Sequence, residues 1–411
     1  MSRLEPFPVK IVRPEWAEEV VSPMHDSLTP EERAAIMAER PYSWLHVSRT
    51  SEDASDDVGE DEIAEEEARA FRRLEEVGAF EDFPEPALYV YRIATPDHEQ
   101  TGIVGEVPHE AFAEDRVLGH EGVQRERVDA LERHLERVGA VSTLVALTFR
   151  ADDDVQKLVE AATEEPVLRR IASEDVEQSV WRIDDADAIE RIRERLDRQV
   201  LYITDGHHRA RASMELWERA GRPPGGAVPA VLFPHDELRM LAFHRRVAGP
   251  LPMPVDRLVG ALRERANVEE RRPDPDERGV VGLYVNGRWY RLALPPDGSG
   301  GGMGSLDVTR LHREILEPLF GLGLAGGPGL EFVSGAVPQE ELTRRVDEDG
   351  GAAFTLVPPT LEQFFDVADR RERMPAKTTF FDPKPRAGLF LRVRTGSAPG
   401  RPTGPSTRSP G

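Results

Sequence analysis

Residues 200–213 place a strand, a tight turn and the start of a helix directly after one another. The β-branched, apolar run 200–204 predicts a buried strand, and the alanine-rich stretch 210–220 predicts a helix. Asp205-Gly206 lies between them, and this dipeptide is typical of turns. Such a unit directs the free N–H groups and the partial positive charge of a helix N-terminus toward one point.

The same turn concentrates functional side chains, namely Asp205, His207, His208 and Arg209. A helix cap followed by exposed polar residues would explain the aspartate alone. Capping requires neither two histidines nor an arginine beside Gly206, so we favour a turn that binds an anion and carries out chemistry on it.

A phosphate group at this turn would meet backbone donors, including the region of Gly206, and two imidazoles. Arg209 would add a planar, two-pronged contact to phosphate oxygens. Asp205 is suited to hold Mg²⁺ or to orient His207 through a hydrogen bond. A zinc site is disfavoured, because adjacent histidines in a turn seldom ligate one ion and the chain has neither a HExxH motif nor a cysteine.

Charge and composition exclude several classes of function. The 411 residues include 53 Lys and Arg against 76 Asp and Glu, a net charge of −23, so general nucleic-acid binding is disfavoured. No apolar run approaches the roughly 20 residues of a membrane helix. The charged, proline-containing start of the chain does not resemble a signal peptide, and cysteine is absent. We therefore expect a cytoplasmic protein without membrane segments.

The chain is predicted to divide into an N-terminal segment 1–95, a core 96–250, a C-terminal α/β segment 251–394 and a disordered tail 395–411, whose Gly, Pro, Ser and Thr content cannot order itself. Periodicity predicts helices at 30–39, 60–76, 126–138, 154–162, 166–173, 186–198, 210–220, 255–266, 306–319 and 361–369. It predicts strands at 43–47, 87–93, 101–107, 141–149, 200–204, 228–233, 239–245 and 354–358, and a hairpin over 282–294.

Several segments resemble one known family. Gly119-His120-Glu121, the turn 205–209 and the stretch Met374–Leu389 match motifs of the family of domain of unknown function 1015, and the likeness extends over 5–394. Two positions depart from the family pattern: His25 stands where the family has tyrosine before Asp26, and Ala210 replaces a frequent tyrosine.

The central part, from the helix 126–138 to the turn 205–209, also resembles the ParB/sulfiredoxin-like fold. The predicted fold is thus α+β, with a mixed ParB/sulfiredoxin-like core and additional N- and C-terminal α/β segments. That group includes kinases of free serine with a similar Asp-Gly-His-His-Arg turn, so the resemblance implies phosphate handling here. It also implies that Glu121, beside His120, is the base that takes the proton of the acceptor hydroxyl.

Residues 374–388 hold two of only four lysines in an arginine-rich chain. Lys377, Thr378, Lys384 and Arg386 would form a second anion-binding wall if this segment folds over the turn. A surface loop with solvated charges explains the same residues equally well.

These features predict a kinase of a small hydroxylated, serine-like metabolite that depends on Mg²⁺ and on ATP or ADP. The nucleotide and the small molecule are its expected partners, and the sequence leaves a homodimer open. Two alternatives stay open: a nucleotide-binding regulatory switch of ParB-like fold, and a phosphoester hydrolase acting at the same turn.

Overall fold

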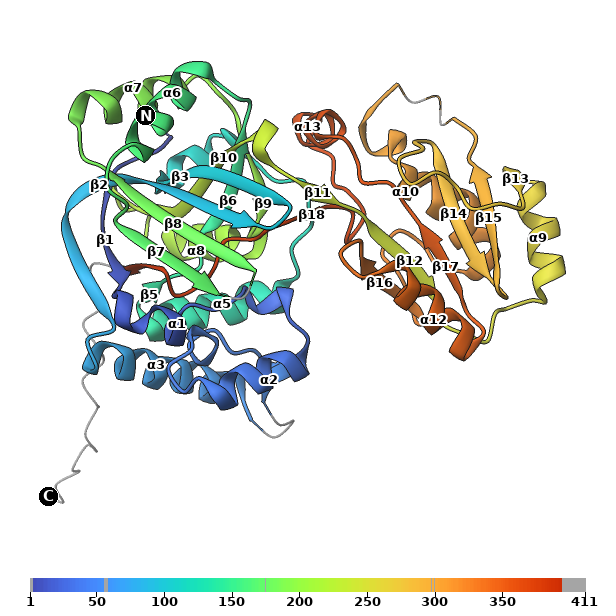
Figure 1. Cartoon of the computed structure of the whole chain (residues 1–411), viewed down its shortest axis with the longest axis horizontal. Coiled ribbons are helices and arrows are strands. Elements are labelled where there is room, and N and C mark those ends of the chain that lie inside the picture. The colour runs from blue at the N-terminus through green and yellow to red at the C-terminus, as the bar shows by residue number, and fades with distance from the viewer. Residues whose placement is uncertain (1–2, 55–57, 174, 297, 299, 394–411) are drawn as a thin grey trace, which may run out of the picture.

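The computed structural model contains two lobes, each built around one β-sheet (Figure 1). It describes residues 3–54, 58–173, 175–296, 298 and 300–393. The tail predicted to be disordered, 395–411, lies outside the described residues. Helices and strands are mixed in both lobes, and the larger sheet contains parallel as well as antiparallel neighbours, which confirms the α+β class. The ParB/sulfiredoxin-like core and the division at residues 95, 250 and 394 remain predictions.

The larger lobe surrounds an 11-stranded sheet, as counted over the described residues. Its main path runs β4-β9-β6-β10-β3-β2-β1-β19-β5, and β8 joins β7 to β2. The strands are β1 Phe7–Val12, β2 Phe80–Thr95, β3 His98–Pro108, β4 Val117–Leu118, β5 Ala140–Val141, β6 Val145–Phe149, β7 Arg169–Ser173, β8 Val176–Ile183, β9 Leu201–Asp205, β10 Ala227–Pro234 and β19 Phe390–Val393. Strands from both ends of the chain therefore meet in one sheet.

Both faces of this sheet are covered, because β2 alternates its buried side chains between two cores. Tyr89 and Tyr91 belong to one core and Leu88 and Val90 to the other. The helices of this lobe are α1 Ala17–Val20, α2 Pro30–Glu39, α3 Glu60–Glu76, α4 His109–Ala113, α5 Arg125–Val138, α6 Asp153–Thr163, α7 Ala186–Leu196 and α8 His207–Arg219. In Figure 1, α1, α2, α3 and α5 lie along one side of the sheet, and α6 and α7 lie on the other.

The smaller lobe contains a six-stranded sheet in the order β13-β15-β14-β17-β12-β16. Its strands are β12 Phe243–Val247, β13 Asn267–Glu269, β14 Val280–Val285, β15 Arg288–Ala293, β16 Leu330–Ser334 and β17 Ala352–Thr355. Its helices are α9 Val255–Arg263, α10 Asp307–Leu311, a π-helical turn His312–Leu316, α11 Glu317–Phe320, α12 Gln339–Asp349 and α13 Leu361–Asp369. The short strands β11 Met240–Leu241 and β18 Phe380–Phe381 pair where the chain passes between the lobes (Figure 1).

The chain thus leaves the larger lobe after β10, builds the smaller lobe, and returns to the larger lobe through residues 374–390. We name this returning segment the strap. Because β19 then pairs antiparallel with β1, the strap ends inside the main sheet, and the pairing of β18 with β11 holds it at residues 380–381. None of the described helices combines the length and apolar character needed to cross a bilayer.

Two expected elements are wrong. Residues 44–46 form a 3-10 helix instead of a strand, because the Ser43 hydroxyl accepts a hydrogen bond from the N–H of Leu45 and closes a local turn. Residues 166–173 do not form a helix; Arg169–Ser173 is β7, which pairs with β8, and β8 in turn pairs with β2. In the second case tertiary pairing overrides the local pattern.

The crowding around Gly102 in β3 gives a test of the central sheet. A Cβ at Gly102 would lie 2.7 Å from the carbonyl oxygen of Leu232 and 2.7 Å from the ring of Phe233. Gly102→Ala should therefore lower the free energy of unfolding by about 2 kcal/mol or more, as measured by urea denaturation. The matched control is Gly260→Ala in α9, where a Cβ meets open space; it should raise stability by about 0.5–1 kcal/mol. Equal effects would contradict the packing described here.

Candidate functional site

The turn between β9 and α8 is the centre of the candidate site. β9 ends at Asp205, and α8 begins at His207, earlier than the alanine pattern alone predicted. Gly206 has φ +95°, in the left-handed region, and a Cβ there would lie 2.7 Å from Nη2 of Arg209. The left-handed backbone favours glycine at this position. In the described part of the chain, no group accepts a hydrogen bond from the N–H of His207, His208 or Arg209. Three donors at the helix start thus remain for a ligand.

A β-bulge precedes this turn. Ile203 lies opposite Leu147 on β6, and Asp205 lies opposite Ala146, so Thr204 is an extra residue without a partner across the ladder. Bulges of this kind change the direction of side chains at the end of a strand. The end of β9 is therefore shaped differently from the regular strand that precedes it.

Four alternating charges lie at the turn. Asp205 accepts from Nη2 of Arg209 at 2.6 Å and from Nζ of Lys384 at 2.8 Å, and Lys384 also contacts Asp26 at 2.7 Å. Burial works against the charge of Asp205, but Lys384 and Arg209 prevail and lower its pKa. Burial likewise opposes the charge of Lys384, and the two carboxylates raise its pKa. Asp205 and Lys384 are therefore both charged at neutral pH.

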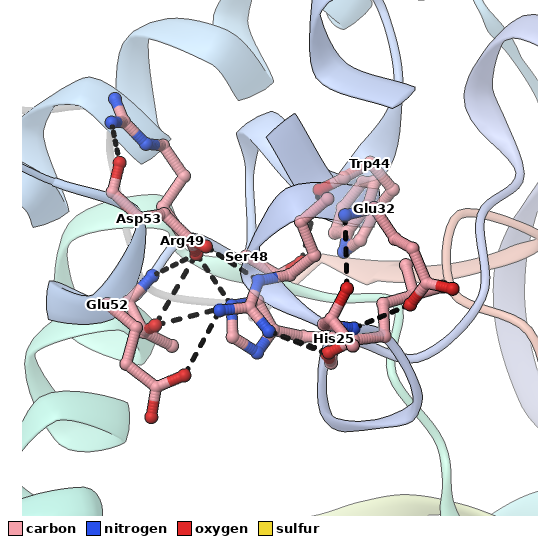
Figure 2. A network of polar contacts seen from close by, with 11 residues as sticks. His25, Glu32, Trp44, Ser48, Arg49, Glu52 and Asp53 are labelled. Atoms are coloured by element: carbon pink, nitrogen blue, oxygen red, sulfur yellow. Dashed lines mark hydrogen bonds and ion pairs between the residues drawn. The ribbon is translucent and has the colours of Figure 1, made fainter. Parts of the chain in front are cut away.

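Asp26 reaches this point because a separate polar network fixes the 3-10 helix that carries it, His25–Ser27. Figure 2 shows that network, in which Nε2 of His25 lies 2.6 Å from Oδ2 of Asp53. Nε of Arg33 donates to the other Asp53 oxygen at 2.6 Å, and its Nη1 donates to the carbonyl of Leu28 at 2.9 Å. Burial disfavours ionised Asp53, yet the hydrogen bonds from His25 and Arg33 lower its pKa. A buried ion pair thus holds the segment that presents Asp26.

His120 and His207 form a buried pair of rings with centroids 4.6 Å apart. Nδ1 of His120 faces the carbonyl of Ile203 at 3.0 Å, and its Nε2 lies 2.9 Å from Oγ1 of Thr379. The N–H of His120 donates to Nε2 of His207 at 3.3 Å, so that nitrogen carries no proton. Burial lowers the pKa of His120 to about 4 and that of His207 well below its usual value. Both imidazoles are therefore neutral.

Glu121 lies beside this pair at the edge of the site. Its Oε2 is 3.8 Å from Nδ1 of His207, and its side chain is 38 % exposed. Burial raises the pKa of Glu121, and the charge of Lys377 partly offsets that rise. A carboxylate with a raised pKa, near a neutral imidazole and partly open to solvent, has the properties of a general base.

His208 contacts the loop before α5. Its Nε2 accepts a hydrogen bond from the N–H of Gln124 at 3.0 Å, and burial is the main cause of its lowered pKa. The neutral ring therefore carries its proton on Nδ1, which makes His208 a donor at this site and not a base.

The strap supplies the remaining predicted residues, but not in one wall. Lys384 lies at the turn, and Lys377, with φ +53°, places its Nζ 5.4 Å from the ring of Phe243. The hydroxyl of Thr378 is buried and donates to the carbonyl of Pro375 at 2.6 Å, whereas Thr379 is the residue that reaches His120. The backbone N–H of Arg386 donates to the hydroxyl of Tyr91 at 3.2 Å.

Two further residues at the site had no local signal in the sequence. Phe364 in α13 packs edge-on against His120, with ring centroids 4.7 Å apart. Gln124 contributes only its backbone. Phe364 is marked out only when α13 of the smaller lobe lies against the turn, and Gln124 only when its loop meets α8.

Asp205 does not fit as the ligand of a resident Mg²⁺. Both of its carboxylate oxygens already bind cationic side chains, Lys384 and Arg209. Within the described ranges, no group of three or more His, Cys, Asp or Glu residues is arranged to hold a metal ion. Magnesium bound to the phosphates of a nucleotide would arrive as part of the substrate, since Mg²⁺ commonly keeps few protein ligands.

The family model described as "Protein of unknown function (DUF1015)" matches residues 5–309, so the chain belongs to this family. The expected family membership is confirmed. No curated protein is significantly similar to the sequence.

Several solved structures are distantly similar. A free serine kinase in complex with AMP shares 13 % identity at a TM-score of 0.37, covering 70 % of this chain and 91 % of that one. C-terminally truncated SbnI from Staphylococcus aureus shares 11 % at 0.38, covering 68 % and 82 %. A conserved hypothetical protein from Pyrococcus furiosus shares 13 % at 0.34, covering 68 % and 91 %. Because these TM-scores lie below 0.5, the chemistry has to be inferred from the site itself.

Removing Lys384 tests the alternating charges. Lys384→Met leaves Asp205 and Asp26 without their shared cation and should cost about 3 kcal/mol of unfolding free energy at pH 7. The difference in unfolding free energy between the wild type and Lys384→Met should be largest between about pH 5 and pH 10. This difference should decrease as the pH falls below about 3.9, because the pKa of Asp205 is lowered in the folded protein. It should also decrease as the pH rises above about 10.4, because the pKa of Lys384 is raised in the folded protein. Lys157→Met, an exposed control in α6, should change stability by less than about 0.5 kcal/mol.

The buried histidines give a second test. The ring of His120 should remain neutral at pH 5.5 in ¹⁵N NMR spectra, with its proton on Nδ1, because burial lowers its pKa to about 4. An unfolded histidine binds a proton near pH 6.5. His120 should therefore remove about 1.4 kcal/mol of stability per pH unit as the pH falls from 6.5 toward 4. A doubly protonated ring at pH 5.5 would refute the described environment.

Proposed function

We propose that this protein is a kinase that transfers a phosphoryl group from magnesium-bound ATP or ADP to the hydroxyl of a small, serine-like metabolite. One observation carries the proposal. Segments far apart in the sequence, around Asp26, Glu121, Asp205 and Lys384, converge at the N-terminus of α8. They bring together open backbone donors, two cations and a carboxylate with a raised pKa.

The phosphates would bind at the start of α8. The N–H groups of residues 207–209 are available there, and the helix dipole favours negative charge. Nε of Arg209 is buried without a hydrogen-bond partner, and Nη1 of Arg209 contacts only Sδ of Met24, at 3.9 Å. An oxygen acceptor supplied by a phosphate would satisfy these donors.

Lys384 would neutralise a bound phosphate with its ammonium group while keeping its contact with Asp205. Its other partner, Asp26, has a side chain that is 47 % exposed, so this contact is the weaker constraint. A phosphate oxygen would replace the Asp26 carboxylate beside the ammonium. The buried contact between Lys384 and Asp205 would keep the lysine in place during that exchange.

Glu121 would accept the proton of the acceptor hydroxyl. The hydroxyl oxygen forms a bond to the terminal phosphorus, the bond to the leaving nucleotide oxygen breaks, and the proton moves to the Glu121 carboxylate. His207 acts as a positioning residue, because one ring nitrogen accepts from the backbone and the other faces Glu121. His208 would donate Nδ1–H to a phosphate or hydroxyl oxygen. Such a reaction depends chiefly on positioning and charge neutralisation.

The experiment is to incubate the protein with Mg²⁺ and ATP, ADP or CTP in a mixture of small hydroxylated metabolites, and to follow phosphorus by ³¹P NMR. A new phosphomonoester supports the kinase. Nucleotide hydrolysis without an acceptor product would overturn it in favour of a phosphoester hydrolase. Nucleotide binding without turnover would overturn it in favour of a regulatory switch.

Glu121→Gln should lower the rate of phosphomonoester formation by at least about 10²-fold, because the amide cannot accept the hydroxyl proton. Nucleotide affinity should change little, since the phosphates bind at the other groups of the turn. Glu126→Gln, at an exposed position in α5, is the matched control and should keep the wild-type rate. Equal rates for Glu121→Gln and the wild type would remove Glu121 from the mechanism.

A further inference from the structure

Arg245 in β12 is a fully buried cation without a carboxylate partner. It is 0 % exposed, and no acidic residue in the described part of the chain forms an ion pair with its guanidinium. Its partners are neutral: Nε donates to Nε2 of His312 at 3.3 Å, Nη1 to the carbonyl of Phe243 at 3.0 Å and Nη2 to the carbonyl of Ala376 at 3.1 Å. The guanidinium also stacks over Phe332, 4.7 Å from the ring centroid.

This arrangement is costly for a structural contact. A buried guanidinium loses its hydration, and burial lowers the pKa of Arg245 to about 9. Hydrogen bonds to carbonyls could be made by a neutral donor at lower cost. The ring of His312 is oriented to accept the hydrogen bond from Arg245. Its Nδ1 faces the carbonyl of Leu322, so its Nε2 accepts from Nε of Arg245. It belongs to the π-helical turn 312–316, and such turns are frequent at functional sites.

The contact to Ala376 connects this buried charge to the candidate site. Ala376 precedes Lys377, whose backbone is in the left-handed region and whose charge acts on Glu121. On one side of Ala376, the N–H of Met374 donates to the carbonyl of His120 at 2.8 Å. On the other side, Thr379 contacts the ring of His120. The strap residues 374–379 are thus held by His120 from the larger lobe and by Arg245 from the smaller lobe.

Phe243 completes the link. Its carbonyl accepts from Arg245, and its ring lies under Nζ of Lys377. A shift of the guanidinium would therefore disturb both the backbone before Lys377 and the surface on which the lysine rests.

We propose that Arg245 is a positioning residue: by fixing the Ala376 carbonyl it keeps Lys377 in its left-handed backbone conformation over the Phe243 ring, and so couples the smaller lobe to the strap residues that contact His120 at the turn. The reaction that this positioning serves rests on the proposed function. The placement of the strap by Arg245 does not, and it can be tested without any activity.

The first experiment uses hydrogen–deuterium exchange on the full-length Arg245→Met variant. Exchange in peptides covering 374–381 should rise by at least about tenfold, the change expected for loss of a charged hydrogen bond. Exchange in the hairpin 280–293, which β17 separates from β12 in the same sheet, should stay as in the wild type. Arg245→Lys keeps a charged donor and should give an intermediate rise. The control is Arg278→Met, an exposed arginine that also donates to a loop carbonyl, that of Pro358, and should leave 374–381 unchanged.

Wild-type protection of 374–381 in a variant whose hairpin is intact would overturn the inference. Loss of protection throughout the smaller lobe in both Arg245→Met and Arg245→Lys would also overturn it, because Arg245 would then be a general structural residue.

The second experiment uses the kinase assay. With the strap released, kcat of Arg245→Met should fall at least about tenfold while the KM for nucleotide changes less than about twofold. The acid limb of the kcat profile should move to higher pH, because Lys377 no longer lowers the pKa of Glu121. A lower kcat with an unmoved acid limb would contradict the link through Lys377. Absence of kinase activity in the wild type would reject the proposed function alone, because the exchange experiment still decides the role of Arg245.

Discussion

The ammonium group of Lys384 lies between two carboxylates, 2.8 Å from Asp205 and 2.7 Å from Asp26, and the site depends on this arrangement. The three residues come from the end of β9, from the strap and from a short helix near the N-terminus. A lysine in a buried position must be compensated, so separating Lys384 from Asp205 would be costly. Beyond Lys384 the strap continues into β19, which pairs with β1 in the main sheet.

Neutral imidazoles complement these charges. His120 and His207 are buried where a positive charge would be costly, and the backbone donates to or accepts from their nitrogens in a way that fixes which nitrogen carries the proton. The turn is thus divided into a charged half, built on Asp205, and a neutral half, which presents Glu121 to solvent. Phosphate binding and proton acceptance can therefore occupy neighbouring but separate positions.

Much of the local structure was predictable. The helices 30–39, 60–76 and 361–369 begin and end where periodicity predicted, because a run of helix-forming residues acts over a few positions. The strand expected at 43–47 and the helix expected at 166–173 were wrong. One was decided by a hydroxyl–backbone contact, and the other by pairing with β8, which no short window contains.

The sequence by itself determined that a strand, a glycine turn and a helix start would follow one another at 200–213, because glycine, aspartate and the apolar pattern dictate backbone shape over a few residues. It also identified most of the residues that meet there. Only the tertiary structure decided how they meet: that Lys384 would neutralise Asp205, that Thr379 and not Thr378 would reach His120, and that Arg245 would hold the strap. Those contacts join residues more than a hundred positions apart, and their energies depend on burial, which is a property of the folded chain alone.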